Sequence, residues 1–264
     1  MIPMLPANSK IGYLIGQNHM LFQCRLMPYD PLACEFLNSL SKELLSDAEA
    51  KQYPDVVSFA FWCRKANIIK LKESFDETHI RLGLGVVFHI APSNVPINFA
   101  FSYAFSLLAG NANIVRVPSK DFPQTDIVCR IISKLFNSEK FKHIAETTAF
   151  VKYEQDDDIT RSFSEICNAR IIWGGDETIK SIRKIPIPVR SIEIAFADRY
   201  SFCIIDGVSI HASSDSELKR LATAFYNDTY LMDQNACSSP HLIVWLSNGK
   251  ELAATKHKFW NSVY

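Results

Sequence analysis

The sequence predicts an α/β protein in which helices cover a parallel β-sheet, preceded by a mainly helical N-terminal segment. From residue 85 onward, short apolar runs alternate with longer amphipathic runs, and glycine, proline or asparagine separates them. Short apolar runs predict buried strands, and the longer runs predict helices. Strands that alternate with helices favour right-handed crossovers and a parallel sheet. With 264 residues, 48% of them hydrophobic, the chain is long enough to bury a large core.

The N-terminal segment, residues 1–81, is expected to contain a hairpin and two helices. The alternating stretch "IGYLIGQNHMLFQCRL", residues 11–26, predicts the hairpin. A helix over 31–45 has Pro31 in its first turn and an apolar face formed by Leu32, Phe36, Leu37, Leu40 and Leu44. A second helix is predicted over 55–75, with Asp55 as its N-cap.

Residues 82–230 carry the strand–helix alternation. Strands are predicted at 85–90, 113–117, 148–153, 169–173 and 201–206. Helices are predicted at 97–109, where Gly110-Asn111 ends the run, at 124–137, at 158–166, shortly after Gly174-Gly175, and at 214–226. Ser214 and Glu217 have capping-box spacing, and Leu218, Leu221, Ala222 and Phe225 form one stripe. The layout is Rossmann-like, but the GxGxxG phosphate loop is missing.

The final segment, residues 231–264, begins with the polar junction "DQNACSS" and continues into a strand over 241–246. Cys237 therefore lies in a break between a helix and a strand. A buried structural cysteine would normally lie inside one of those elements, whereas a turn can present its sulfur to a cleft.

Composition and cysteine spacing exclude several classes of protein. Lysine plus arginine and aspartate plus glutamate both total 28, so no net charge points to nucleic acid or to an anionic membrane. No apolar run has membrane-spanning length, and the N-terminus lacks the pattern of a secretory signal. The seven cysteines are scattered without a CxxC pair, which argues against a zinc site or a disulfide framework. We expect a reduced, cytoplasmic protein.

Four stretches carry a family resemblance. They are "FAFWCRKANI" (59–68), "GVVFHIAPSNVPINFAFSYAFSLLAGNANIVRVPSK" (85–120), "RIIWGGDETIK" (170–180) and "DQNACSS" (233–239). In this order the chain resembles the acyl-CoA reductase branch of the aldehyde dehydrogenase superfamily, and in particular the LuxC-type fatty-acyl-CoA reductases. Each motif is moderately specific, whereas the ordered set is strong.

The resemblance implies a Rossmann-like parallel sheet of the aldehyde dehydrogenase type. Residues 82–230 would form the cofactor-binding domain, and 231–264 the nucleophile loop and the start of a catalytic domain. Relatives continue well beyond the equivalent of Tyr264, so we expect acylation of this chain without brisk NADPH oxidation. A role in luminescence would rest on the resemblance alone.

Two catalytic residues follow from the resemblance. Cys237 would be the nucleophile, because a thiolate can take an acyl group from a thioester and hold it as an acyl-cysteine. The alternative is one free cysteine among seven. Asn94, between two prolines in "APSNVP", would donate a hydrogen bond to the oxyanion, alongside the backbone N–H of Cys237. The alternative for Asn94 is a helix N-cap.

Cofactor residues are expected after two strands. In "VPSK", Ser119 and Lys120 would contact the adenosine ribose, and Lys120 with Arg116 would favour the 2′-phosphate of NADPH. The alternative is a solvated loop. Gly174 and Gly175 open a helix whose free N–H groups would face the diphosphate, the alternative being a plain tight turn.

No general base is assigned. Glu193 is the nearest candidate by order, but its surroundings lack the family's Gly-Gly, and hydride transfer needs no activated water. His89 and His241 are expected to be packed rather than catalytic.

The leading hypothesis is therefore NADPH-dependent reduction of a fatty acyl-CoA to the aldehyde. The expected partners are an acyl-CoA or another acyl donor and an acyl-transferring enzyme, with no nucleic acid. The alternatives are an acyl-phosphate reductase that uses the same cysteine, and a non-catalytic relative that binds only a nucleotide or a partner subunit. The residues leave these alternatives open.

Overall fold

The computed structural model describes residues 4–16, 25–76, 78–230, 234, 236–247 and 251–264. The chain forms two compact units, Met1–Ala197 and Asp198–Tyr264. Each unit has its own sheet. The domain boundaries predicted after residues 81 and 230 stay a prediction.

A six-stranded sheet forms the centre of the first unit, in the order β1-β4-β3-β2-β5-β6. Its strands are β1 (Gly12–Ile15), β2 (Val86–Ile90), β3 (Ala112–Arg116), β4 (Thr148–Lys152), β5 (Ala169–Trp173) and β6 (Ile192–Phe196). β1 pairs antiparallel with β4, and every other pair is parallel. The predicted α/β fold with a Rossmann-like parallel sheet is confirmed.

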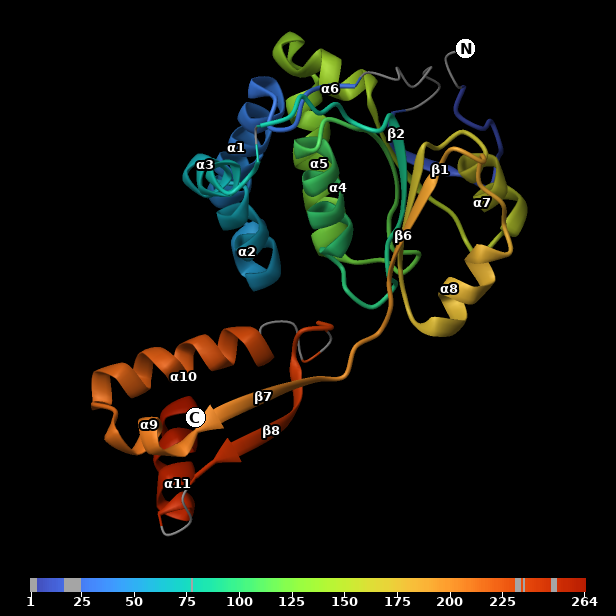
Figure 1. Ribbon diagram of the computed structural model, residues 1–264. Coiled ribbons are helices and arrows are strands. Elements are labelled where there is room, and N and C mark those ends of the chain that lie inside the picture. The colour runs from blue at the N-terminus through green and yellow to red at the C-terminus, as the bar shows by residue number, and fades with distance from the viewer. Residues whose placement is uncertain (1–3, 17–24, 77, 231–233, 235, 248–250) are drawn as a thin grey trace. The chain divides into compact units, whose positions relative to one another are not determined.

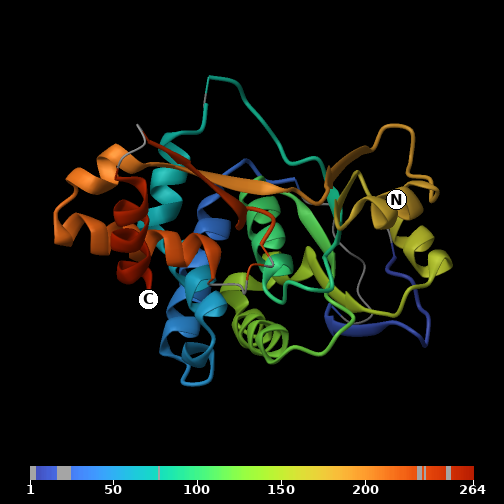
Figure 2. The same ribbon diagram turned by 90° about the horizontal axis from the view of Figure 1, so that it is seen from below.

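Helices cover both faces of this sheet (Figure 1). On one face lie α4 (Asn98–Leu108) and α5 (Pro123–Phe136), and α1 (Pro31–Ser46), α2 (Pro54–Trp62) and α3 (Lys65–Glu73) pack outside them. On the other face lie α7 (Asp157–Ser164) and α8 (Asp176–Arg183). Figure 2 shows the same division from below, with α7 and α8 in yellow and α4 and α5 in green. Short turns η1 (Ala50–Gln52) and η2 (Glu139–Phe141) and helix α6 (Lys142–Glu146) complete the unit.

The strand sequences explain the two layers. All five residues of β2 are buried, as expected for a central parallel strand. Alternate side chains point to opposite faces. Val86, Phe88 and Ile90 therefore pack with Ile159 of α7 and Ile179 of α8, whereas His89 faces Ser102 of α4.

The N-terminal segment confirms one predicted helix and corrects the second. α1 buries Phe36, Leu37, Leu40 and Leu44, as predicted. The helix predicted over 55–75 is broken in two, because Arg64 adopts an extended conformation. Asp55 is not an N-cap: Tyr53 takes that position, and the Asp55 side chain is buried in the first turn.

The predicted hairpin over 11–26 is seen only in its first strand. β1 pairs with β4 across the sheet. Residues 17–24 lie outside the described residues. Gly110 ends α4 as predicted and has a φ of 83°, a conformation that favours glycine.

The second unit has a two-stranded parallel sheet of β7 (Ser201–Asp206) and β8 (Pro240–Leu246). Helices α9 (Gly207–Ala212), α10 (Asp215–Thr229) and α11 (Leu252–Val263) accompany it. Its core is formed by Ile205, Ile210, Leu218, Phe225 and Phe259. The predicted capping box at Ser214 and Glu217 is confirmed, whereas Leu221 points to solvent.

Two strands differ from what the sequence predicted. Strand 201–206 pairs with β8 and not with the main sheet. The sixth strand of the main sheet is β6, which was not predicted. Its exposed and half-buried residues alternate, as on a one-sided edge strand, so it lacks the continuous apolar run that marked the central strands. None of the helices in the described parts of the chain is long and apolar enough to cross a membrane.

Candidate functional site

A cavity of about 540 Å³ lies where β2, β3, β4 and β5 end in the first unit. The carboxyl ends of parallel strands meet at one edge of a sheet, and open α/β sheets bind their ligands there. Of the predicted site residues, five line this cavity: Asn94, Arg116, Ser119, Gly174 and Gly175. Segments that are distant in sequence are thus brought together.

Asn94 lies in the turn after β2, within "APSNVP", and its side chain is exposed. The alternative interpretation as a helix N-cap is wrong. α4 starts only at Asn98, its N-cap is Ile97, and no side chain caps it. The Asn94 side chain thus does not cap α4, and its role as an oxyanion donor stays a prediction.

Arg116 ends β3 and is held against Tyr153, the residue after β4. Its Nη2 donates to the Tyr153 carbonyl oxygen at 3.2 Å, and its guanidinium carbon lies 4.4 Å from the centre of the Tyr153 ring. Nε is buried without a hydrogen-bond partner. Among the described residues no carboxylate pairs with Arg116, so its charge is available to an anionic ligand.

Ser119 and Lys120 lie on the loop after β3, but the structure separates them. Ser119 lines the cavity, whereas Lys120 is exposed beside it and does not belong to the lining. A lysine side chain is long and flexible. The predicted contact of Lys120 with a 2′-phosphate therefore stays a prediction.

Gly174 and Gly175 connect β5 to α8, and Gly175 is the N-cap of that helix. A Cβ on Gly174 would lie 3.1 Å from the Thr178 side chain, which explains the need for a small residue there. The first turn of α8 holds Asp176 and Glu177. These carboxylates already interact with the positive end of the helix dipole and compete with any phosphate at this position.

Three carboxylates in the cavity wall were missed by the sequence analysis: Glu154, Asp157 and Glu177. Glu154 follows β4 as Ser119 follows β3, so its place after a predicted strand was the signal that could have identified it. Arg116 is the one cation among the described lining residues. The cavity is therefore not a general anion site. In chemical terms, an arginine can bind a phosphate and a carboxylate can accept a hydrogen bond from a hydroxyl group.

Cys237 lies in the second unit and its side chain is exposed. Its loop is anchored on both sides. The Ser201 hydroxyl donates to the Cys237 carbonyl oxygen at 2.7 Å, and the buried Ser239 hydroxyl donates to the Asp228 carbonyl oxygen at 3.3 Å. Gln234 has a φ of 59°, which marks a tight turn before the cysteine. The sulfur is exposed but lines neither of the two cavities found among the described residues, so the prediction that a turn presents it to a cleft stays a prediction.

The other described cysteines differ from Cys237. Burial raises the pKa of Cys129 to about 12 and that of Cys167 to about 11. Cys63 is also buried, and its pKa is raised further. Cys34 and Cys203 are partly buried, and burial raises the pKa of both. All six described cysteines are free thiols, and Cys237 is the one that is exposed.

Glu193 is part of an ion-pair network and not of the cavity. Its carboxylate accepts from Arg170 Nη2 at 2.6 Å and from Arg183 Nε at 2.7 Å. Partial burial would raise the pKa of Glu193, but the hydrogen bonds from Arg183 and Arg170 outweigh it and hold that pKa below its usual value. Arg170 is almost fully buried, so Glu193 neutralises its charge. A carboxylate that is ion-paired and has a lowered pKa is a weak general base near neutral pH.

The two histidines singled out in the sequence have different surroundings. His89 is fully buried and hydrogen-bonded on both ring nitrogens, as expected for a packed histidine. Burial lowers its pKa to about 4, so it is neutral at pH 7. The expectation that His241 is packed is wrong, because it is exposed and stacks on Tyr200 with ring centres 5.5 Å apart.

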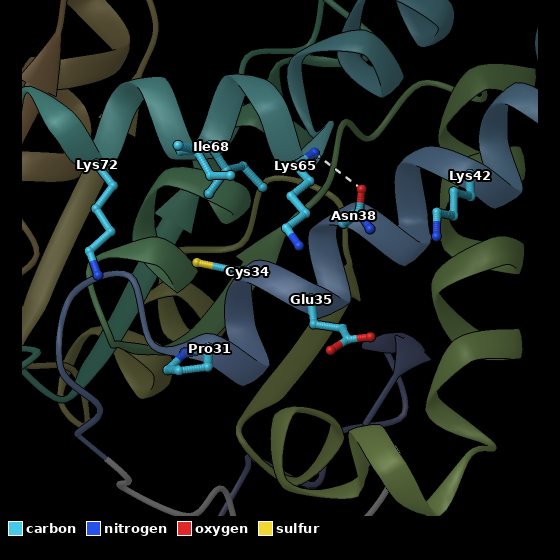
Figure 3. A pocket seen from close by; sticks show the side chains of 9 residues that line it. Pro31, Cys34, Glu35, Asn38, Lys42, Lys65, Ile68 and Lys72 are labelled. Carbon is cyan, nitrogen blue, oxygen red and sulfur yellow. Dashed lines mark hydrogen bonds between the residues drawn. The ribbon is translucent and has the colours of Figure 1, made fainter.

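A second cavity of about 500 Å³ lies between α1 and α3 (Figure 3). Lys42, Lys65, Lys72, Cys34 and Glu35 line it, together with Pro31, Asn38, Ile68 and Ile69. The Lys65 backbone N–H donates to Asn38 Oδ1 at 3.1 Å, and Glu35 pairs with Lys140 at 2.5 Å. Its lysines are exposed, and burial raises the pKa of the Cys34 thiol. These features do not define a ligand. Within the described ranges no cluster of His, Cys, Asp or Glu could hold a metal.

Comparison with known proteins decides the family. The model of the acyl-CoA reductase (LuxC) family matches residues 66–257, most of the chain. The chain belongs to the acyl-CoA reductase (LuxC) family. A long-chain acyl-protein thioester reductase of Aliivibrio fischeri is 27% identical over 170 residues, which are 64% of this chain and 33% of that protein. The chain thus matches about a third of that relative's length.

Solved aldehyde dehydrogenase structures share the fold. A putative aldehyde dehydrogenase from Burkholderia cenocepacia has a TM-score of 0.60 at 15% identity, covering 87% of this chain and 51% of its own. An NAD-dependent benzaldehyde dehydrogenase from Corynebacterium glutamicum has a TM-score of 0.59 at 14% identity, covering 89% of this chain and 55% of its own. The fold of this acyl-CoA reductase family member is therefore of the aldehyde dehydrogenase type, over about half the length of those structures.

Proposed function

We propose that this protein takes part in the reduction of a fatty acyl thioester to an aldehyde, with NADPH bound in the cavity at the carboxyl ends of the strands. The observation that carries the proposal is that this cavity gathers Asn94, Arg116, Ser119, Gly174 and Gly175, which were selected from sequence alone. Family membership supports the acyl thioester as the substrate class. The cavity by itself supports only the binding of a nucleotide and does not identify the second substrate.

The cavity residues fit the cofactor in part. Arg116 has a buried unpaired Nε and no carboxylate partner among the residues that the structure describes, so it would interact with a phosphate. Ser119 and Glu154 would bond ribose hydroxyls, and Lys120 would reach a 2′-phosphate from the cavity rim. When bound, NADPH would supply the hydride that reduces the acyl group. Asp176 and Glu177, in the first turn of α8, would repel a diphosphate near Gly174 and Gly175 and so weaken its binding there.

Cys237 is the proposed nucleophile. Its thiolate attacks the thioester carbonyl carbon and forms a new C–S bond. The C–S bond to coenzyme A then breaks, and coenzyme A leaves as a thiolate that takes up a proton. The acyl group now rests on Cys237 Sγ, and the thiolate is regenerated when the reduced acyl group leaves as the aldehyde. Asn94 is the proposed hydrogen-bond donor for the oxyanion, a contribution of about 3 to 4 kcal/mol where it is well placed.

The acyl donor is proposed to be a coenzyme A thioester, and an acyl-transferring partner enzyme would supply or receive acyl groups. A reducing, cytoplasmic setting is part of the proposal, because the seven cysteines are scattered through the sequence without a CxxC pair.

Isothermal titration calorimetry of the purified protein with NADPH tests the proposal. We expect saturable binding that is weakened by Arg116→Ala. Arg64, an exposed arginine at the break between α2 and α3, provides the matched control as Arg64→Ala. Absence of binding in the unmodified protein, or equal loss in both variants, would refute the cofactor assignment.

A further inference from the structure

A line of buried polar side chains leads from the interior of the sheet to the wall of the cavity. Trp173 Nε1 lies 3.1 Å from Ser102 Oγ, Ser102 Oγ lies 2.8 Å from His89 Nδ1, and His89 Nε2 lies 3.1 Å from Asn113 Oδ1. His89 and Asn113 are fully buried, and Ser102 nearly so. Trp173, at the end of β5, is half-buried and lines the cavity.

The direction of every hydrogen bond in this line is determined. Asn113 Nδ2 donates to the Asn111 carbonyl oxygen at 2.9 Å, which leaves Oδ1 facing the histidine. An amide oxygen only accepts, so His89 Nε2 carries the proton and Nδ1 has the free lone pair. Nδ1 accepts from the Ser102 hydroxyl, whose oxygen is then free to accept from the indole N–H of Trp173. The low pKa of His89 agrees with this neutral form.

The indole is fixed from a second side as well. Trp173 and Phe196 are register partners on β5 and β6, and their rings stack with centres 3.9 Å apart and planes 10° apart. A core that only had to be filled would use apolar side chains, because burying polar groups is costly unless all are bonded. These hydrogen bonds therefore do more than fill the core. At the cavity end they hold the aromatic ring of Trp173.

We infer that His89 and Ser102 are positioning residues that hold the Trp173 indole as a flat wall for the nicotinamide half of the bound cofactor. This inference rests on the proposed nucleotide function of the cavity. Strand order supports the choice of half. β3, which leads into the loop of Ser119, and β5, which ends at Trp173, are separated by β2, so these two strands lie on the order of 10 Å apart across the sheet. If the adenosine ribose lies at Ser119, the nicotinamide side is the side of Trp173.

The test compares two serine-to-alanine variants on the same helix. Ser102→Ala removes the link to Trp173. Ser106→Ala is the matched control: Ser106 is also buried on α4, one turn later, but its hydroxyl accepts from Asn111. The probes are NADP⁺ and 2′,5′-ADP, which lacks nicotinamide. Ser102→Ala should weaken NADP⁺ about three- to tenfold, as expected for one lost hydrogen bond, and should leave 2′,5′-ADP within about twofold. Ser106→Ala should change neither.

A second readout does not depend on the ligand. The indole N–H signal of Trp173, assigned through Trp173→Phe, should exchange with solvent slowly in the unmodified protein and at least about tenfold faster in Ser102→Ala. Equal exchange in both would overturn the positioning role. Unchanged NADP⁺ affinity, or equal loss for NADP⁺ and 2′,5′-ADP, would overturn the assignment to nicotinamide. If the unmodified protein binds neither probe, the proposed function fails and the assignment to nicotinamide with it, while indole exchange still decides whether His89 and Ser102 hold Trp173.

Discussion

The carboxyl-edge cavity and the Cys237 loop are built in different ways. The cavity draws its wall from the ends of four strands, so each residue contributes one contact among many. The Cys237 loop is one turn in the second unit, tied by Ser201 and Ser239, and its proposed chemistry depends on one sulfur atom. Changes to the loop should therefore have all-or-none effects, whereas changes around the cavity should be graded. Substitutions at Cys237 and at Lys120 test this contrast.

The largest effect is expected at Cys237. Incubation with a fatty acyl-CoA should acylate Cys237, and Cys237→Ala should abolish the labelling. The thiolate is the reactive form, and a pKa of about 12 leaves Cys129 with about a thousandfold less thiolate than an ordinary thiol. Peptide mass spectrometry would locate the acyl group.

Cys203→Ala is the matched control, because Cys203 lies in the same unit and is partly buried. It should leave labelling unchanged. Labelling spread evenly over the cysteines would mean that Cys237 is an ordinary free thiol.

The next effect concerns the stability of the first unit. Glu193→Gln leaves the charge of Arg170 buried without its carboxylate, and loss of one partner of a buried pair costs about 3 to 5 kcal/mol. The pKa of Glu193 is lowered in the folded state. Its contribution is therefore present at neutral pH and is lost as the pH falls below the ordinary glutamate value of about 4.3.

Urea unfolding at pH 7 measures this effect, with Glu177→Gln as control. Glu177 pairs with Lys180 at 2.8 Å, but both side chains are exposed, so the control should cost less than about 1 kcal/mol. Equal costs would show that the network around Glu193 is no stronger than a surface pair.

A third effect is the pH dependence of stability that His89 contributes. Its pKa is about 4 in the folded protein and about 6.5 when unfolded. Between these values the unfolded state binds more protons, so stability is complete above pH 6.5 and decreases as the pH falls toward 4, by about 3 kcal/mol in all. His89→Gln should flatten this part of the profile, whereas His257→Gln, at an exposed position, should not. An unchanged slope in His89→Gln would contradict the burial of a neutral histidine.

The sequence predicted the sheet well because its central strands are buried on both faces and are therefore continuous apolar runs. It missed β6, whose outer side chains remain exposed, and it assigned 201–206 to the main sheet because a strand's partner is not encoded locally. Only tertiary contacts decide that β7 pairs with β8.

The candidate site, too, was predictable from the sequence only in part. Asn94, Ser119 and Gly174 follow predicted strands directly, so their meeting at the carboxyl edge could be predicted from topology. The link between Trp173, Ser102 and His89 could not, since it depends on which face of the sheet each side chain occupies and on helix α4 lying above them. The Glu193 network likewise required the register of β5 against β6, where Arg170 faces Glu193.

The smallest effect is expected at Lys120, on the rim of the cavity. Lys120 is exposed, and none of the described residues forms an ion pair or hydrogen bond with it, so its ammonium can reach a 2′-phosphate beside Ser119. A charge-assisted hydrogen bond contributes about 1.5 to 3 kcal/mol, and solvent exposure favours the lower end, so NADPH should bind about tenfold more tightly than NADH. Lys120→Glu should remove or reverse this preference by repelling the phosphate, and Lys70→Glu, which makes the same charge change on α3, should preserve it. Calorimetric titration of both cofactors against the three proteins measures the ratio. Equal affinities in the unmodified protein would assign the ribose contact to Glu154 instead, because a carboxylate there accepts from the 2′-hydroxyl of NADH and repels a phosphate.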